Sequence, residues 1–554
     1  MTKAVKEGLI EEKEIDVSVR RVLKGRFELG MFDPDERVPY AKIPYEVVEC
    51  SEHVAKSLEM ARKSMVLLKN EKRTLPLGKG IKKIAVVGPN AADSAMLWAN
   101  YNGYPTHTVT ILEGIRKKVP DAEVIYESGC DHVFETVSYD LYDYVTNPKG
   151  KGFEAEYFNN LELDGEPVCR ETVRHLDYAS RRNLRIAPHV QSTRFSARFS
   201  GELNVQETGE VEFKFTANNA VRLFVGNRKV IDTWEKIGGE QVYRFPVEKG
   251  RKYPVKVEYK RVSGGKAELS MRLGMNRPVD YSGTADKVKD ADIIIFVGGI
   301  SPRLEGEEMP VRLDGFKKGD RTDIEVPKVQ REMVKALKGT GKPVVYVLCS
   351  GSAMALSWED AHVDAILNAW YGGQEAGTAV ADILFGDYNP SGRLPVTFYK
   401  STGQLPDFED YDMKGRTYRY MTETPLYPFG HGLSYTDFVY KKAELSSKKV
   451  KRGEPVSLTL EVANAGKRDG DEVVQVYIRN PNDPEGPAKS LKGFVRVGIE
   501  AGKSRRVDIT LPPEAFYSFD DKTQTMEIRR GKYYILYGGS SDDKKLKSVS
   551  LELE

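Results

Sequence analysis

Two parts of the chain contain short, mainly apolar candidate strands separated by segments of helical periodicity. The candidate strands cover residues 84–90, 123–129, 293–297, 344–348 and 365–370. Helices are expected between them, for example over residues 51–68 and 326–337. Continuous apolar strands that alternate with helices indicate a parallel sheet with both faces covered. The pattern therefore predicts an α/β domain.

Apolar and polar residues alternate strictly in two other regions, residues 152–275 and the chain after about residue 437. Clear examples are residues 211–216, 221–225 and 253–259 in the first region, and 456–462, 472–478 and 532–537 in the second. A period of two is typical of strands with one buried face. The first region is predicted to be an all-β domain inserted into the α/β domain, and the second a β-sandwich of immunoglobulin-like size.

The first 32 residues are predicted to form one amphipathic helix that ends near Gly25. Ile15, Val19, Val22 and Leu23 share one face of that helix. An apolar stripe of this kind needs a surface to cover, and nothing precedes it in the sequence. This is a first indication of a missing domain.

Length and charge narrow the class of protein. A chain of 554 residues is expected to hold three or four domains at about 150 residues each. The net charge of +2 argues against a nucleic-acid groove, which needs a clustered basic excess. No apolar run is long enough to span a bilayer, and the first residues lack the apolar stretch of a secretory signal. Neither nucleic acid nor membrane is expected as a partner, and localisation stays open.

The four cysteines are scattered and have no CxxC spacing. Cys349 lies in an apolar run and is expected to be a small core residue. Neither a metal site nor a disulfide framework is predicted.

The strand at residues 291–299 leads directly into a cluster of carboxylates at Glu305, Glu307 and Glu308. Ligands of open α/β sheets bind beyond the carboxyl ends of the strands. The cluster therefore suggests a carboxylic acid held over a bound substrate. On the residues alone, solvated loop charges are the better interpretation.

Several motifs, spread along the chain in a fixed order, resemble the second domain of glycoside hydrolase family 3, the β-glucosidase and β-xylosidase group. They are Ser64-Met-Val-Leu-Leu-Lys-Asn70, Val86-Val-Gly-Pro-Asn90, Leu384-Phe-Gly-Asp-Tyr-Asn-Pro-Ser-Gly-Arg-Leu-Pro395 and Tyr427-Pro-Phe-Gly-His-Gly-Leu-Ser-Tyr-Thr436. The insert resembles a PA14 domain through Tyr157-Phe-Asn-Asn160 and the segment from Val221 to Trp234. The C-terminal region resembles a fibronectin type III-like domain through Ser490-Leu-Lys-Gly-Phe494.

The resemblance implies a domain plan. Residues 1–44 correspond to the terminal helix and linker of a (β/α)₈ barrel. Residues 45–150 and 276–436 correspond to a three-layer α/β sandwich, residues 151–275 to the PA14-like insert, and residues 437–554 to an immunoglobulin-like sandwich of the fibronectin type III-like kind. In the family the barrel carries an aspartate nucleophile in a Ser-Asp-Trp-like motif. That tripeptide is absent from this sequence, so the barrel is expected to be missing or to lie on another polypeptide.

The resemblance also implies roles for single residues. The family's acid/base glutamate often occurs as Glu-x-Glu followed by Gly-x-Asp-Arg, which here matches Glu305-Gly-Glu307 and Gly319-Asp-Arg321 with an insertion between them. Glu307 is therefore the predicted acid/base residue, with Glu305 and Glu308 as rivals. Asp320 and Arg321 are expected to form an ion pair that fixes the loop.

Further candidates lie in segments rich in aromatic and hydrogen-bonding groups. Trp98, Arg416 and Tyr418 are predicted to bind substrate, with ordinary surface packing as an equally good alternative for each. His431, between two glycines, is expected to make a structural hydrogen bond. Asn218-Asn219 stands where calcium-binding PA14 domains have paired aspartates, and neutral amides are poorer ligands for a hard cation. No metal or other cofactor is expected.

The implied function is that of the acid/base-bearing portion of a retaining exo-β-glycosidase. Its substrate is an oligosaccharide with a terminal β-glucose or β-xylose, and its nucleophile is expected to come from the barrel. The chain alone is expected to be inactive as a hydrolase. The alternative is a non-catalytic, truncated protein that binds carbohydrate.

Overall fold

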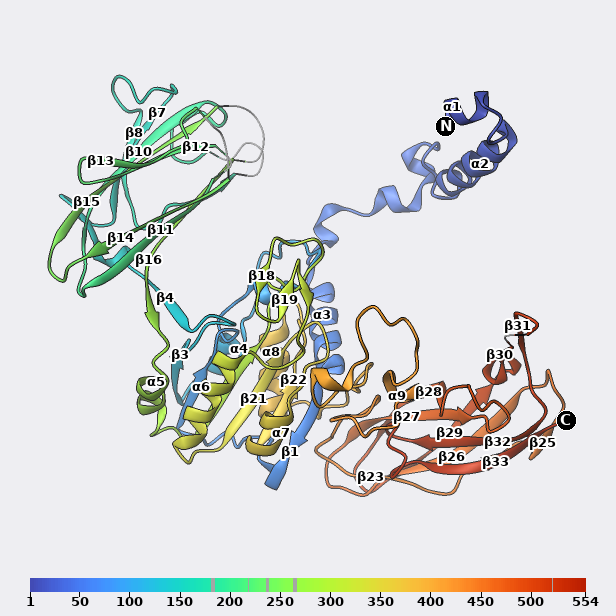
Figure 1. Ribbon diagram of the computed structural model, residues 1–554. Coiled ribbons are helices and arrows are strands. Elements are labelled where there is room, and N and C mark those ends of the chain that lie inside the picture. Colours follow the sequence, from blue (N-terminus) through green and yellow to red (C-terminus); the bar gives the residue numbers. More distant parts are fainter. Residues whose placement is uncertain (181–184, 218, 236–238, 263–266, 521) are drawn as a thin grey trace. The chain divides into compact units, whose positions relative to one another are not determined.

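The computed structural model describes residues 1–180, 185–217, 219–235, 239–262, 267–520 and 522–554 (Figure 1). The chain forms two compact units. The first comprises Met1–Ser128, Ala285–Pro327 and Val334–Glu554, and the second comprises Gly129–Thr284 and Lys328–Met333. The second unit interrupts the first in the sequence, and its main segment runs from Gly129 to Thr284.

A six-stranded sheet forms the centre of the first unit, with the strand order β1-β22-β21-β17-β2-β3. The strands are β1 (Val66–Asn70), β2 (Lys83–Val87), β3 (Glu123–Glu127), β17 (Ile293–Gly299), β21 (Val344–Cys349) and β22 (Ala365–Asn368). Five of them are parallel, and β1 pairs with β22 in the antiparallel direction at one edge. The predicted parallel sheet is confirmed, with one antiparallel strand that the sequence pattern did not indicate.

Helices cover both faces of this sheet. Alternate strand residues such as Ile295 and Val347 form one core with α3 (Ser51–Ser64), α4 (Ile111–Lys118) and α8 (Ala376–Leu384). Their neighbours in the strands are equally buried, because successive side chains of a strand point to opposite faces. On that other face α7 (Ser357–His362) lies in front of the sheet, together with the part of α6 (Lys328–Gly339) that begins at Val334 (Figure 1). Burial on both faces explains the continuous apolar runs of the sequence.

The expected helix over residues 51–68 was too long. α3 ends at Ser64, and the next residues form β1, in which Val66 and Leu67 pair with Asn368 and Leu367. The apolar run is buried at the sheet edge, and its residues gain inter-strand hydrogen bonds there. Helical periodicity could not locate this change, because a short apolar run fits either a buried helix or a strand.

The N-terminal helix is also placed differently from the prediction. A short helix, α1 (Thr2–Lys6), comes first, and α2 (Glu12–Glu28) continues past Gly25. A glycine inside a helix costs only about 1 kcal/mol, whereas Gly30, with φ +70°, ends the helix. There the amide groups of Gly30 and Met31 donate to Phe27 and Arg26, which is a Schellman motif.

The apolar stripe of α2 is exposed to solvent. Val19 and Val22 are 46% and 58% exposed, and Phe27 just beyond them is 63% exposed. Within the described residues nothing covers this face.

The second unit consists of two antiparallel sheets around an apolar core. The strands are β4 (Thr136–Asp140), β5 (Val145–Asn147), β6 (Gly150–Lys151), β7 (Phe153–Phe158), β8 (Cys169–Val173), β9 (Asp177–Ser180), β10 (Phe195–Asn204), β11 (Gly209–Ala217), β12 (Ala220–Val225), β13 (Arg228–Asp232), β14 (Gly239–Val247), β15 (Lys252–Arg261) and β16 (Ala267–Pro278). The strands expected at residues 211–216, 221–225 and 253–259 lie in β11, β12 and β15. Phe213 and Phe215 point to the core from β11, as their spacing of two predicts.

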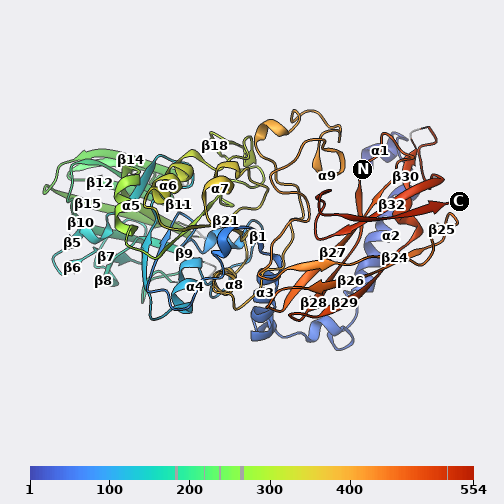
Figure 2. The same cartoon turned by 90° about the horizontal axis from the view of Figure 1, so that it is seen from below.

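The C-terminal part of the first unit is a second sandwich, coloured orange to red in Figures 1 and 2. One sheet contains β23 (Phe438–Tyr440), β24 (Glu444–Leu445), β26 (Val456–Asn464) and β29 (Ser504–Leu511). The other contains β25 (Lys449–Val450), β27 (Gly470–Arg479), β28 (Ser490–Ile499), β32 (Gly531–Gly538) and β33 (Lys547–Leu553). A small hairpin, β30 (Ser518–Asp520) and β31 (Thr525–Glu527), lies apart from both sheets.

Buried polar contacts join this sandwich to the α/β part. Arg393 forms an ion pair with Glu472 at 3.2 Å, and the two side chains are only 9% and 5% exposed. Tyr440 donates to the same carboxylate at 3.2 Å. The Gln475 amide donates to the Gly430 carbonyl at 3.1 Å. The two parts therefore share a buried polar junction.

Candidate functional site

Three adjacent parallel strands bring their carboxyl ends to one edge of the six-stranded sheet. β17 leads to the loop that contains Glu305, Glu307 and Glu308, called the carboxylate loop below. β21 leads to Ser350-Gly-Ser352, and β22 leads to Trp370-Tyr371. Because β17, β21 and β22 are consecutive in the sheet, their loops meet at this edge. This is the place where open α/β sheets bind ligands.

Glu305 is held by donors from the two neighbouring loops. One carboxylate oxygen accepts from the Gly351 amide and the Tyr371 hydroxyl, each at 2.8 Å, and the other accepts from the Ser352 hydroxyl at 3.0 Å. Burial, together with the charge of Glu305, raises the pKa of Tyr371. This tyrosine therefore stays protonated and donates a hydrogen bond to Glu305. The half-buried Glu305 thus acts as an acceptor that ties three loops together.

Glu307 has a different environment. Its side chain is exposed and accepts one hydrogen bond, from the Tyr101 hydroxyl. That bond raises the pKa of Tyr101. Asn100 donates to the carbonyl of Glu305 at 2.9 Å. The segment from Trp98 to Gly103, selected from the sequence for its polar and aromatic character, therefore does reach the carboxylate loop.

The insertion between Glu307 and Gly319 contains β18 (Arg312–Leu313) and β19 (Phe316–Lys317), which form a small three-stranded sheet with β20 (Asp320–Arg321). It brings the chain back to its starting point, because the Gly306 amide donates to the Gly319 carbonyl at 3.1 Å. Gly319 has φ +90°, and a Cβ atom there would overlap the Gly306 carbonyl oxygen. The insertion therefore leaves the Glu-x-Glu and Gly-Asp-Arg motifs side by side.

The expected ion pair between Asp320 and Arg321 is wrong. The two residues are neighbours in β20, where successive side chains point to opposite faces. Arg321 instead donates to the carbonyl oxygens of Asp323 at 2.9 Å and Glu325 at 3.3 Å. Burial lowers the pKa of Arg321, and the charges of Glu305 and Asp323 partly offset this. Arg321 still fixes the loop, through backbone carbonyls.

A largely apolar cavity of about 620 Å³ adjoins the anchors of Glu305. Gly351 and Ser352 line it together with Trp370, Tyr418 and Phe429. Its volume is within the range of small-molecule sites. Tyr418 stacks on Phe429 with ring centroids 4.3 Å apart, and its hydroxyl accepts from the Leu491 amide at 3.0 Å. The structure thus brings one predicted substrate-binding residue to a cavity near Glu305.

The other two candidates make local contacts. Arg416 donates to the carbonyl of Asp412 at 3.0 Å and to that of Asp407 at 3.1 Å, which closes its own loop. Trp98 donates from its indole to the Thr108 hydroxyl at 2.8 Å and meets the Tyr104 ring edge to face. Glu308, the second rival of Glu307, is exposed and has φ +49°.

Sequence reasoning missed Ser352, Trp370 and Tyr371. Trp370 ends a predicted strand, and Ser352 and Tyr371 follow predicted strands within a few residues, which was the available signal. The strand order that makes β17, β21 and β22 neighbours is not visible in the pattern of apolar residues, so nothing connected these positions with Glu305.

His431 makes the structural hydrogen bond that the sequence predicted. Its Nε2 lies 2.9 Å from the Leu68 carbonyl oxygen, and its ring stacks on Tyr427 at 5.0 Å. Burial lowers its pKa from 6.5 to about 4. The neutral ring therefore donates Nε2–H to Leu68.

This lowered pKa predicts a pH dependence of stability. Between pH 6.5 and 4 the unfolded state binds a proton at residue 431 that the folded state excludes, so the free energy of unfolding falls as the pH is lowered through that window. We expect His431→Gln to lose less stability than the parent between these pH values in urea denaturation. His53→Gln, at an exposed position, is the matched control. Parallel pH profiles for the parent and His431→Gln would contradict the prediction.

The described residues contain no group of three or more His, Cys, Asp or Glu side chains that could hold a metal ion. Cys349 is fully buried, as expected for a core residue. Asn218 lies outside the described residues, and Asn219 is buried. None of the helices in the described part of the chain combines the length and apolar character needed to cross a membrane.

Comparison with known proteins finds relatives that are named β-xylosidase and β-glucosidase. The chain is 43% identical over 558 residues to a xylan 1,4-β-xylosidase of Xylanibacter ruminicola, covering 100% of this chain and 64% of that protein. It is 29% identical to a periplasmic β-glucosidase of Salmonella typhimurium, covering 99% of this chain and 57% of that protein. The chain therefore spans only about three fifths of the length of these relatives.

A solved β-glucosidase of Kluyveromyces marxianus, in complex with glucose, matches with a TM-score of 0.67 and 26% identity. The match covers 91% of this chain and 62% of that one. The family profile of the fibronectin type III-like domain matches residues 472–541. The profile of the glycosyl hydrolase family 3 C-terminal domain matches residues 65–435. The chain belongs to glycosyl hydrolase family 3, and the carboxylate loop after β17 lies within its C-terminal domain.

Proposed function

We propose that this chain supplies the general acid/base of a retaining exo-β-glycosidase that removes terminal β-glucose or β-xylose from oligosaccharides. Glu307 is the proton donor. The observation that carries the proposal is the contrast between the two carboxylates of the loop. Glu305 is committed to three protein donors, whereas Glu307 is exposed and contacts only the Tyr101 hydroxyl among the contacts that the structure describes. A general acid must be able to reach the leaving-group oxygen.

A retaining mechanism requires a second carboxylate about 5–5.5 Å from the first. We assign this nucleophile to a barrel domain outside residues 1–554. The relatives are named β-xylosidase and β-glucosidase and are longer than the part that this chain matches, which leaves room for such a domain. The barrel, when present, also explains an exposed apolar face on α2.

The proposed substrate contacts lie at the same edge of the sheet. Tyr418 and Trp370 offer aromatic faces in the cavity beside Ser352, where a sugar ring can stack. Trp98 supports the segment that carries Tyr101. Arg416 acts on this site by closing its own loop. We further propose that the unit from Gly129 to Thr284 is a PA14-like module, which its two packed antiparallel sheets support.

The proposal is tested by complementation. The complementing segment is the part of the Xylanibacter ruminicola relative that this chain does not match. We expect the chain alone to show negligible hydrolysis of aryl β-xylosides and β-glucosides, and the mixture to turn them over. No turnover in the mixture, while oligosaccharides still bind to the chain, would favour a non-catalytic carbohydrate-binding protein.

Glu305 is expected to be a positioning residue of this site. Glu305→Gln replaces an acceptor with an amide whose NH₂ group opposes existing donors, and one lost hydrogen bond to a charged group is worth about 1.5–3 kcal/mol. We therefore expect kcat of the mixture to fall about 10–150-fold. Tyr371→Phe, which removes one donor, should show a smaller loss.

Varying the leaving group of the substrate distinguishes a positioning role of Glu305 from a role in proton transfer. Misplacement of the loop slows all aryl glycosides by a similar factor, so the ratio of kcat/KM for Glu305→Gln to kcat/KM for the parent should not change with the pKa of the leaving phenol. A loss confined to poor leaving groups would instead identify Glu305 as the acid.

A further inference from the structure

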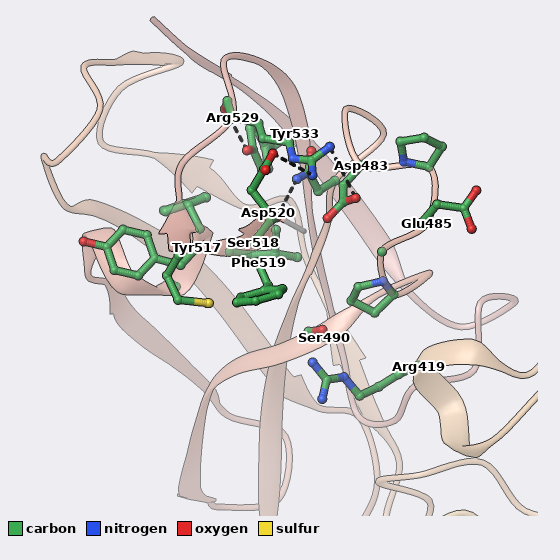
Figure 3. Close-up of a pocket in the computed structure, with 18 of the residues that line it drawn as sticks. Arg419, Asp483, Glu485, Ser490, Tyr517, Ser518, Phe519, Asp520, Arg529 and Tyr533 are labelled. Carbon is green, nitrogen blue, oxygen red and sulfur yellow. Dashed lines mark hydrogen bonds and ion pairs between the residues drawn. The ribbon is translucent and has the colours of Figure 1, made fainter. Parts of the chain in front are cut away.

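A second cavity, of about 560 Å³, lies between α9 (Thr417–Tyr420) and the loops at one end of the C-terminal sandwich. Arg419 and Tyr420 line it from α9, and Ser490 and Lys492 line it from β28. The β30 hairpin and the segment before it add Tyr517 and Phe519. Figure 3 shows Arg419 extending toward the side of the cavity that Ser490 and Phe519 form. The volume suits a small ligand.

The cations that line this cavity differ in their partners. Arg529 is neutralised, because Asp483 lies 3.4 Å and Asp520 lies 3.9 Å from its guanidinium group. Arg419 and Lys492 have no ion-pair partner within the described part of the chain. Burial and the charge of Arg419 lower the pKa of Lys492. Two like charges that approach each other without a counter-charge are destabilising, and an anion between them would relieve the repulsion.

Two donors of the same wall also lack partners. Ser490 is 6% exposed, and its Oγ and the Nε of Arg419 are buried without a hydrogen bond in the described residues. Buried polar groups of native proteins nearly always have a partner. Rotation about χ1 lets the Ser490 hydroxyl turn toward the cavity. A hydroxyl, a guanidinium and an ammonium group together form a donor set that matches a carboxylate.

Aromatic side chains also line the cavity. Tyr517 and Phe519 belong to its lining and are 38% and 48% exposed. Exposed aromatic faces next to polar donors suit a ring that is apolar on its face and polar at its edge. A pyranose has this character.

We propose that this cavity binds the carboxylate-bearing sugar of an acidic oligosaccharide, that is, a uronic acid unit. Arg419 and Lys492 bind the carboxylate, and Tyr517 and Phe519 contact the ring. The proposal rests on the proposed function, because it takes the ligand from the same class, oligosaccharides. No residue of the carboxylate loop lines this cavity, and the site carries no reaction step.

Calorimetric titration of the full chain with glucuronic acid at neutral pH tests this site. Glucose is the neutral match, and acetate is the bare carboxylate. We expect saturable binding of glucuronic acid and much weaker binding of both controls. No saturable binding of glucuronic acid would overturn the proposal, and so would glucose binding of equal strength that Lys492→Gln weakens to the same extent. Equal binding of acetate would overturn the assignment of the ligand as a sugar.

Substitutions of the lining residues test where the ligand binds. Lys492→Gln removes a charge that has no partner, so we expect no loss in the free energy of unfolding but about a tenfold or greater loss of affinity. Arg419→Gln should weaken binding similarly. Lys544→Gln, on the exposed surface of the same sandwich, should leave affinity unchanged. Binding that survives both Lys492→Gln and Arg419→Gln would overturn the site.

The two proposals fail separately. Glucuronic acid binding is measured without turnover, so its absence leaves the assignment of Glu307 as proton donor untouched. Normal turnover by Glu307→Gln would likewise leave this binding site standing.

Discussion

Glu307→Gln is expected to lower kcat/KM of the complemented protein for xylobiose or cellobiose by about 10²–10⁴-fold, the usual contribution of general acid–base catalysis. The amide keeps the size of the side chain and its contact with Tyr101 but cannot protonate the departing sugar oxygen. Because Glu307 is exposed, folding should be unaffected. Initial rates of disaccharide hydrolysis, with circular dichroism as a check on folding, measure the effect.

Glu308→Gln is the matched control. It removes an equal charge one residue away from a side chain that is also exposed, and we expect less than a threefold change in kcat/KM, within about 0.6 kcal/mol. A large loss in Glu308→Gln with a small loss in Glu307→Gln would exchange the roles of the two residues.

Glu472→Gln should be the most damaging single change to stability. It leaves Arg393 buried and charged at the junction of the α/β part and the C-terminal sandwich, and breaking a buried ion pair from one side costs about 3–5 kcal/mol. Gln keeps an oxygen that can accept the Tyr440 hydroxyl, so the loss reports mainly on the charge. Urea denaturation measures the free energy of unfolding, and Glu500→Gln, at an exposed position, serves as the control.

A double-mutant cycle isolates the pair. In Arg393→Met/Glu472→Gln no charge is left unpaired, so the double variant should be more stable than the sum of the two single losses implies. Strict additivity, with no coupling between the two positions, would show that the pair contributes nothing to the junction.

Much of the architecture could be predicted from the sequence, because burial leaves a direct trace in residue pattern. Strand β17 is buried along its whole length and appears in the sequence as a continuous apolar run. Strand β11 has one buried face and appears as strict alternation. Boundaries were less accurate where two structures suit the same residues, as at Val66 and Leu67, where an apolar run could extend a helix or form a strand.

The candidate site could be predicted only in part. Glu305 and Glu307 stand out as carboxylates at the end of a strand, but the difference between them depends on Gly351 and Tyr371, which come from other strands. Those contacts depend on strand order, which the local pattern does not contain. The hairpin between Glu307 and Gly319 was visible only as an insertion, and its return to Gly306 needed the folded chain.

The role of Glu307 is tested most directly by the dependence of kcat/KM on the leaving group. Aryl β-xylosides whose phenols range from strongly acidic, such as 2,4-dinitrophenol, to weakly acidic are compared in the complemented parent and in Glu307→Gln. A departing dinitrophenolate needs no proton, so the variant should cleave that substrate nearly as well as the parent and fall progressively behind as the pKa of the phenol rises. An equal loss across the whole series, or no loss at all, would contradict the assignment of Glu307 as the proton donor.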